Sequence, residues 1–162
     1  MWATDITDIP MQKSFRYRVA ILDWATRRVL AWRLSHTLTA NFCAAALQEA
    51  LTRYGTPEIF NTDQGSQFTS TEFTDVLKAY AIRISRDGRR RCHDHLFVER
   101  RWWTVKHEWV SLRPAANGIK QKKSLVECFD WDNCRRPHQS LDWQTPDEAY
   151  FGGLAQAAAK VA

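Results

Sequence analysis

Three acidic residues in three different sequence contexts carry the strongest chemical signal in this chain. Asp5 lies in Thr-Asp-Ile-Thr, Asp63 in Asn-Thr-Asp-Gln-Gly-Ser, and Glu99 in Phe-Val-Glu-Arg. Thirty-five residues separate Asp63 from Glu99, which is enough for a helix, a strand and a loop to bring the two together. Carboxylate oxygens are ligands of Mg²⁺, and two such ions about 3.5–4 Å apart catalyse phosphoryl transfer. We therefore interpret the three acids as a candidate two-metal site.

Each acid also has a simpler interpretation. On a strand, only one of Asp5 and Asp8 can face the site; we choose Asp5, whose apolar neighbours make an unpaired carboxylate costly. A less favoured alternative is that a nearby arginine or a backbone donor pairs Asp5. Asp63 opens a glycine turn, where an aspartate commonly caps its own backbone. Glu99 shares a predicted helix face with Lys106, a pattern that also fits a solvated face. The contexts and the spacing together favour the metal site.

The elements that must position these acids follow from hydrophobic periodicity. The pattern predicts strands and helices in the order strand 2–9, strand 15–23, strand 27–35, helix 40–53, strand 58–61, helix 71–81, strand 82–85, helix 95–110 and helix 124–135. Residues 114–123 are expected to be a polar linker. This order predicts an α/β fold with a mixed five-stranded sheet flanked by helices, which resembles the ribonuclease-H-like plan.

The composition limits the class of protein. A chain of 162 residues with 44% hydrophobic residues can bury one full core and is too apolar to be disordered. The net charge of +5 favours a polyanionic partner, although an ordinary solvated basic surface would give the same balance. The four cysteines form no CxxC pair, so we expect neither a disulfide framework nor a zinc site at Cys92, His93 and His95. With no apolar run of about 18 residues, no membrane partner is expected, and we predict a reducing cytoplasm.

Four sequence blocks resemble the integrase-core transposases of bacterial insertion sequences, the OrfB type within the retroviral integrase superfamily of DDE enzymes. The resemblance runs over about residues 2–151, and the blocks are Trp2 to Thr7, Asn61 to Ser70, Phe97 to Arg100 and Asn133 to Leu141. It implies that Asp5, Asp63 and Glu99 are the catalytic triad. It also implies a catalytic core over residues 1–151, followed by a flexible tail over residues 152–162.

The resemblance further implies a reaction, a cofactor and partners. Two Mg²⁺ or Mn²⁺ ions, held by the triad, would support cleavage of transposon-end DNA and joining of its 3′-hydroxyl to target DNA. The expected assembly is a homo-oligomer on DNA in the bacterial cytoplasm, associated with the nucleoid. The expected DNA contacts are Lys106, Arg100, Arg136 and His138. Arg136 and His138 lie in the family's Arg-Pro-His motif, for which a packing role is an alternative.

Several positions depart from the family pattern. Asp94-His95-Leu96 stands where the family shows Asp-Asn-Ala, and Asp8 and Asp132 replace common aromatic residues. The first strand begins almost at the first residue, which predicts a fragment of a longer transposase. Two other functions therefore stay open. The chain could be an inactive DNA-binding or subunit-pairing remnant, or a ribonuclease-H-like nuclease.

Overall fold

The computed structural model describes residues 1–11, 14–86, 109–110, 115 and 117–159. Its strands are β1 (Trp2–Pro10), β2 (Phe15–Asp23), β3 (Val29–Ser35), β4 (Ile59–Thr62) and β5 (Arg83–Arg86). Its helices are α1 (Ala40–Tyr54), α2 (Ser66–Thr69), α3 (Thr71–Ala79), α5 (Gly118–Cys134) and α6 (Pro146–Ala159), with a 3₁₀ turn at Gln139–Leu141. Most of the predicted helix 95–110 lies outside the described residues.

The five strands form one mixed sheet in the order β3-β2-β1-β4-β5. β1, β2 and β3 are antiparallel neighbours, whereas β4 runs parallel to β1, and β5 runs parallel to β4. Asp23 shapes the turn after β2, because its Oδ2 accepts hydrogen bonds from the backbone N–H and the hydroxyl of Thr26 at 3.0 and 2.7 Å. The predicted α/β fold with a mixed five-stranded sheet is confirmed.

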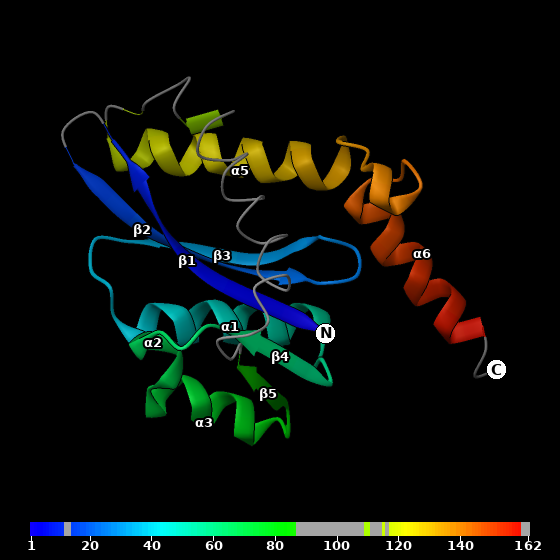
Figure 1. The fold of residues 1–162 in the computed structure, drawn as a ribbon. Helices are drawn as coiled ribbons and strands as arrows, with labels where there is room; N and C mark the ends of the chain where they lie inside the picture. Colours follow the sequence, from blue (N-terminus) through cyan, green and yellow to red (C-terminus); the bar gives the residue numbers. More distant parts are fainter. Residues whose placement is uncertain (12–13, 87–108, 111–114, 116, 160–162) are drawn as a thin grey trace.

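Helices cover both faces of the sheet (Figure 1). Side chains alternate along β2, so Val19 and Ile21 pack into a core shared with α1 and α3, while Ala20 and Leu22 pack into a second core with α5. In Figure 1, α5 lies above the strands, and α1 and α3 lie below them. The central position of β1 in the sheet therefore places Asp5 between two helical layers.

Helices α1 and α3 follow the predicted pattern, except at the end of α3. α1 buries an apolar stripe formed by Cys43, Ala44, Ala46, Leu47, Ala50 and Leu51. The Ser70 hydroxyl caps α3 by accepting a hydrogen bond from the Phe73 backbone N–H at 3.3 Å. Tyr80, which the helical spacing assigns to the apolar side of this helix, is 50% exposed because α3 ends at Ala79. The chain then turns at Ala81 with φ of 54°.

The polar linker expected over residues 114–123 is wrong from residue 118 onward, because α5 begins at Gly118. The Asn117 side chain caps this helix by accepting a hydrogen bond from the Lys120 backbone N–H at 2.9 Å. The lysine-rich first turns of α5 are exposed, apart from Gln121, which is 2% exposed. Local polarity therefore indicates a solvated helix face here, not a linker.

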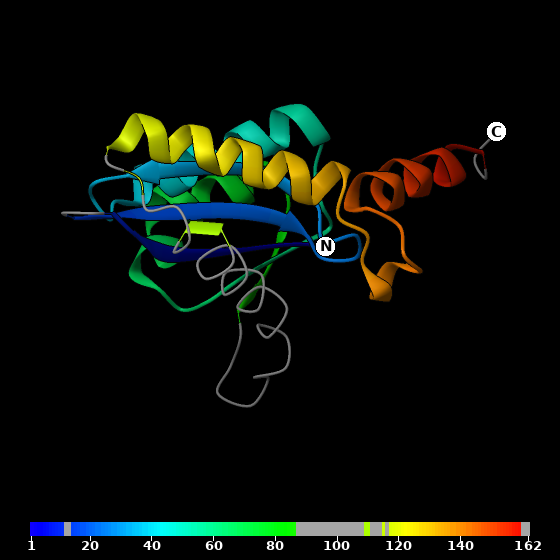
Figure 2. The same cartoon turned by 90° about the horizontal axis from the view of Figure 1, so that it is seen from above.

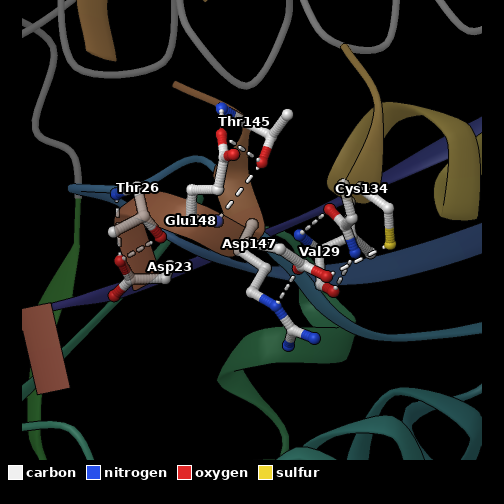
Figure 3. Close-up of polar contacts among 9 residues, drawn as sticks. Asp23, Thr26, Val29, Cys134, Thr145, Asp147 and Glu148 are labelled. Carbon is white, nitrogen blue, oxygen red and sulfur yellow. Dashed lines mark hydrogen bonds and ion pairs between the residues drawn. The ribbon is translucent and has the colours of Figure 1, made fainter. Parts of the chain in front are cut away.

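Helix α6 extends through Pro146–Ala159, so residues 152–159 of the expected tail are helical. An ion pair anchors the helix: Arg28 Nε lies 2.5 Å from Asp147 Oδ1. Three rings surround the guanidinium carbon at 4.8–5.2 Å, from Tyr54, Tyr150 and Phe151. Figure 3 shows the polar contacts at this junction, including the Cys134 thiol donating to Asp147 Oδ2 at 3.1 Å. The boundary at residue 151 falls inside α6 and stays a prediction, as does the flexibility of the tail.

The described cysteines form no disulfide among the described residues: Cys43 and Cys128 are buried and Cys134 is exposed. Among the helices of the described residues, none has the length and apolar character needed to span a bilayer.

Candidate active site

The parallel pairing of β1 with β4 sets the positions of Asp5 and Asp63. Trp2 is paired with Phe60, and Ala3 with Asn61. Asp5 lies two residues beyond Ala3, and Asp63 lies two residues beyond Asn61. If the same register is continued by this equal step, the two acids would come level just past the carboxyl end of β4. Ligand sites of α/β sheets collect at such ends.

Asp63 follows the last residue of β4 and is half-buried. Its Oδ1 accepts a hydrogen bond from the Gly65 backbone N–H at 2.8 Å. Gly65 then begins α2, since its carbonyl accepts from the backbone N–H groups of Phe68 and Thr69 at 3.0 and 3.1 Å. The turn interpretation of Asp63 is thus observed for one oxygen. The other oxygen, Oδ2, makes no hydrogen bond within the described part of the chain, so it remains suited to a cation.

Gly65 keeps this turn close to the carboxylate. A Cβ atom at Gly65 would lie 2.9 Å from Asp63 Oδ1, nearer than Cβ atoms approach other groups. The backbone at Gly65 has φ of −58°, so the requirement for glycine comes from the close approach and not from the dihedral angle. The Asp-Gln-Gly sequence therefore orients the Asp63 carboxylate.

Asp5 is half-buried in the middle of β1 and pairs with Ala20 of β2. Its Oδ1 accepts a hydrogen bond from the Ile6 backbone N–H at 2.7 Å. The neighbouring Thr4 is fully buried and donates its hydroxyl to the Ala20 carbonyl at 2.9 Å, which fixes β1 against β2. Asp8 is exposed, and the choice of Asp5 as the site residue stays a prediction.

Cys43 of α1 lies close enough to Asp63 for the carboxylate charge to affect its thiol. The sequence pattern does not reveal this, because it indicates only an apolar helix position at Cys43. Burial raises the pKa of the Cys43 thiol, and the negative charge of Asp63 raises it further, to about 12. The thiol is therefore protonated at neutral pH and is no nucleophile. The influence of Asp63 on this group places the first turns of α1 close to the candidate site.

Three predicted site residues, Glu99, Arg100 and Lys106, lie outside the described residues. The same is true of Cys92, His93 and His95, at which no zinc site is expected. Within the described part of the chain, no three His, Cys, Asp or Glu residues gather in a group that could hold a metal ion. The structure describes two of the three predicted acids, Asp5 on β1 and Asp63 just after the neighbouring strand β4. The triad as a whole stays a prediction.

Arg136 and His138 lie beyond the end of α5 and make local contacts. Arg136 Nη1 lies 3.7 Å from Asp132 Oδ1, and its guanidinium carbon lies 5.6 Å from the centre of a Trp131 ring. The His138 backbone N–H donates to the Gln144 carbonyl at 3.0 Å and closes a turn. In Figure 1 this end of α5 lies at the right, whereas α2, which follows Asp63, lies at the left. These contacts favour the packing alternative.

The mixed five-stranded sheet with its flanking helices is a ribonuclease-H-like fold, and solved structures share it. The catalytic core domain of BIV integrase superposes with a TM-score of 0.77 at 18% identity, covering 97% of both chains. The HTLV-2 integrase catalytic core domain in complex with magnesium superposes with a TM-score of 0.73 at 20% identity, covering 91% of this chain and 93% of that one.

Sequence comparisons identify the family. Residues 1–92 match a family model described as integrase core domain, and residues 80–146 match a second model with the same description. The chain therefore belongs to the integrase core domain family, among the DDE-type transposase and integrase enzymes. The resemblance seen in the sequence blocks is confirmed.

Two relatives from Escherichia coli K12 are named transposases. Transposase InsF of insertion sequence IS3A is 32% identical over 111 residues, or 67% of this chain. Putative transposase InsK of IS150 is 26% identical over 149 residues, or 91% of this chain. The chain spans 38% of InsF and 53% of InsK.

Proposed function

We propose that this chain is the catalytic core of a DNA transposase, which cuts transposon-end DNA and joins the resulting 3′-hydroxyl to target DNA. The observation that carries this proposal is the equal two-residue step from the Ala3–Asn61 pair to Asp5 and Asp63. This step supports the proposal, because two carboxylates from distant parts of the chain would come level with each other if the parallel register continued beyond the paired residues. The names of InsF and InsK as transposases support the same reaction.

Asp5 and Asp63, with Glu99, would hold two divalent cations, Mg²⁺ or Mn²⁺. The two described acids fit such ions, since carboxylates are hard oxygen donors and Asp63 Oδ2 has no hydrogen-bond partner among the described residues. The related HTLV-2 core was solved in complex with magnesium. Bound metal would lower the pKa of the attacking hydroxyl and stabilise the leaving oxygen. The chain itself orients the acids, through the β1–β4 register and through the Gly65 N–H.

DNA would approach a protein of net charge +5 with electrostatic assistance. Lys106 and Arg100 are the proposed contacts to end DNA, while the contacts of Arg136 with Asp132 and Trp131 make it and His138 weaker candidates. We also propose assembly as a homo-oligomer on DNA, because HTLV-2 integrase cores are described in trimeric and dimeric forms. A bacterial cytoplasmic location on the nucleoid belongs to the same proposal.

Joining of a pre-cut end tests the reaction. The purified chain is mixed with Mn²⁺, a plasmid target and labelled DNA duplexes. The duplexes are taken from the DNA that flanks the gene for this chain on each side, and each ends in a free 3′-hydroxyl. We expect a joined product that Asp63→Asn reduces by at least about 100-fold, because disturbing even the outer shell of a metal site costs 10–100-fold. Asp75→Asn, a matched change at an exposed position of α3, is expected to retain the product.

Three other outcomes would contradict the proposal. Cleavage without joining would indicate a nuclease on the same fold. DNA binding without any product, unchanged by Asp63→Asn, would indicate an inactive remnant. A joined product that Asp63→Asn leaves intact would remove Asp63 from the site.

A further inference from the structure

Arg18 of β2 places a positive charge inside the core. Its side chain is fully buried, at 0% exposed. The guanidinium carbon lies 5.4 Å from the centre of the Phe129 ring of α5, where the face of the ring attracts a cation. In Figure 1 and again in Figure 2, α5 lies along this face of the strands. Because arginine is almost never fully buried without interacting groups, the position of Arg18 relative to the acids of the candidate site is informative.

Arg18 and Asp5 share one face of the sheet. In the antiparallel pairing of β1 with β2, Asp5 is opposite Ala20, and Thr7 is opposite Arg18. Residues directly opposite each other in such a pair point to the same face. Ala20 packs into the core with α5, and so does Ala3, which precedes Asp5 by two residues and therefore points the same way. Arg18 and Asp5 are thus diagonal neighbours on the face that α5 covers.

The packing around Arg18 directs its guanidinium toward the row of residues that contains Asp5. Diagonal neighbours on two strands are about 7–8 Å apart, a distance that a long side chain can bridge. Ala20, opposite Asp5, has only a methyl group and leaves room above it. The Phe129 ring packs against Trp32 with ring centres 5.2 Å apart, and Trp32 is paired with Ala20. The ring that contacts the Arg18 guanidinium therefore lies beside the row formed by Trp32, Ala20 and Asp5.

We propose that Arg18 is a positioning residue for the proposed metal site. Its positive charge attracts the Asp5 carboxylate and offsets the mutual repulsion of Asp5 and Asp63 while no metal is bound. The same charge repels an arriving divalent cation, so Arg18 lowers the affinity of the site for metal. The inference rests on the proposed function, because it assumes that Asp5 and Asp63 hold metal ions. Its consequence is a site that stays folded when metal is scarce and exchanges metal readily.

Calorimetric titration of the whole chain with Mn²⁺ at pH 7 tests this proposal. Only binding that Asp63→Asn abolishes is counted. We expect Arg18→Met to bind Mn²⁺ about tenfold more tightly than the parent, the size of the repulsion between one and two positive charges about 7 Å apart in water-like surroundings. Arg18→Lys keeps the charge but cannot place a planar guanidinium on Phe129, so its affinity should stay within about threefold of the parent. A merely structural role would give both variants unchanged or weaker affinity.

Arg16→Met is the matched control. Arg16 lies on the same face of β2 but is paired with Ile9, four positions along β1 from Asp5, so the Mn²⁺ affinity should change less than about twofold. If Arg18→Met does not fold, Arg18→Gln supplies a neutral side chain that still forms hydrogen bonds, and the same tenfold gain is expected. Urea unfolding is a second readout. Added Mn²⁺ should raise the free energy of unfolding more in the neutral variant than in the parent, because the neutral variant binds the ion more tightly.

The outcomes separate this inference from the proposed reaction. Unchanged or weaker Mn²⁺ affinity in the neutral Arg18 variant would overturn the inference and leave the joining reaction untouched. An equal gain in Arg18→Lys or in Arg16→Met would also overturn it. A parent chain that joins no DNA, while the neutral Arg18 variant still binds Mn²⁺ more tightly, would count against the reaction and support the role of Arg18. Absence of Mn²⁺ binding that depends on Asp63 in the parent and in every variant would overturn both.

Discussion

Gly65 donates its backbone N–H to Asp63 Oδ1 across 2.8 Å, and a side chain at Gly65 would come within 2.9 Å of that oxygen. The glycine thus sets the orientation of a carboxylate that is proposed to bind metal. The contact joins residues only two positions apart. It nevertheless affects how the Asp63 carboxylate is oriented relative to Asp5 on the neighbouring strand β1.

Gly65→Ala should weaken Mn²⁺ binding and joining by about tenfold, since it displaces the Asp63 carboxylate. The fold should tolerate the change, because φ of −58° suits alanine, and the free energy of unfolding should change by less than about 1 kcal/mol. Calorimetric titration with Mn²⁺ and urea unfolding measure the two effects. Gly153→Ala is the control, because nothing lies within 4 Å of a Cβ atom there. Unchanged Mn²⁺ affinity in Gly65→Ala would argue against a metal-binding role of Asp63.

The Cys43 thiol should make the fold less stable at alkaline pH. Its pKa is raised to about 12, whereas an unfolded thiol titrates near 8.5. The stabilisation is complete below about pH 8.5 and is lost as the pH rises toward 12, because only the unfolded thiol ionises in that window. Each pH unit should cost up to about 1.4 kcal/mol. Urea unfolding of the parent and of Cys43→Ala from pH 8 to 11 should give diverging curves, and parallel curves would contradict this assignment.

Asn133→Ala should destabilise the junction of α5 with β3. Two buried hydrogen bonds to the Val29 main chain are lost, so the free energy of unfolding should fall by roughly 2 kcal/mol. Asn117→Ala removes an exposed helix cap at the other end of α5 and should cost only about 1 kcal/mol or less. Urea unfolding compares the two variants. An equal cost would mean that the Val29 contacts add nothing beyond an ordinary cap.

Arg28→Lys should loosen α6 from the rest of the molecule. A lysine keeps the charge but cannot present a planar guanidinium to Asp147 and to three aromatic rings together. Because the Arg28 side chain is only 10% exposed, we expect a loss of roughly 2–4 kcal/mol in the free energy of unfolding. Arg53→Lys, at a position 61% exposed and paired with Glu49, should cost less than about 0.5 kcal/mol. Faster proteolysis within α6 should accompany the first change and not the second.

The strands and α1 can be predicted from sequence because their signals are local. Residues of β2 alternate between two buried cores, and α1 repeats apolar residues at helical spacing, so short windows suffice. The beginning of α5 is missed because Lys120, Lys122 and Lys123 look like a linker. The available signal was Asn117, a residue type that favours helix N-caps.

Contacts between distant residues explain what the sequence does not show. Arg28 and Asp147 are 119 positions apart, and nothing near Arg28 in the chain indicates a buried ion pair. The effect of Asp63 on the Cys43 pKa likewise depends on how α1 folds back beside β4. Asp5 and Asp63 could be selected from motif and spacing. The parallel pairing of β1 with β4, which relates their positions, is seen only in the structure.

The parallel pairing of Trp2 with Phe60 also affects the order in which the strands fold. The two partners are 58 positions apart, whereas the β1–β2 and β2–β3 pairings join near neighbours through short turns. Closing the longer loop is entropically more demanding, so the three-stranded meander should assemble first. During synthesis, Asp5 would lie in the folded β1–β2–β3 meander before the segment that carries Asp63 leaves the ribosome. Any nascent chain that stops before β4 should therefore lack Asp63, one of the acids on which the proposed DNA chemistry depends.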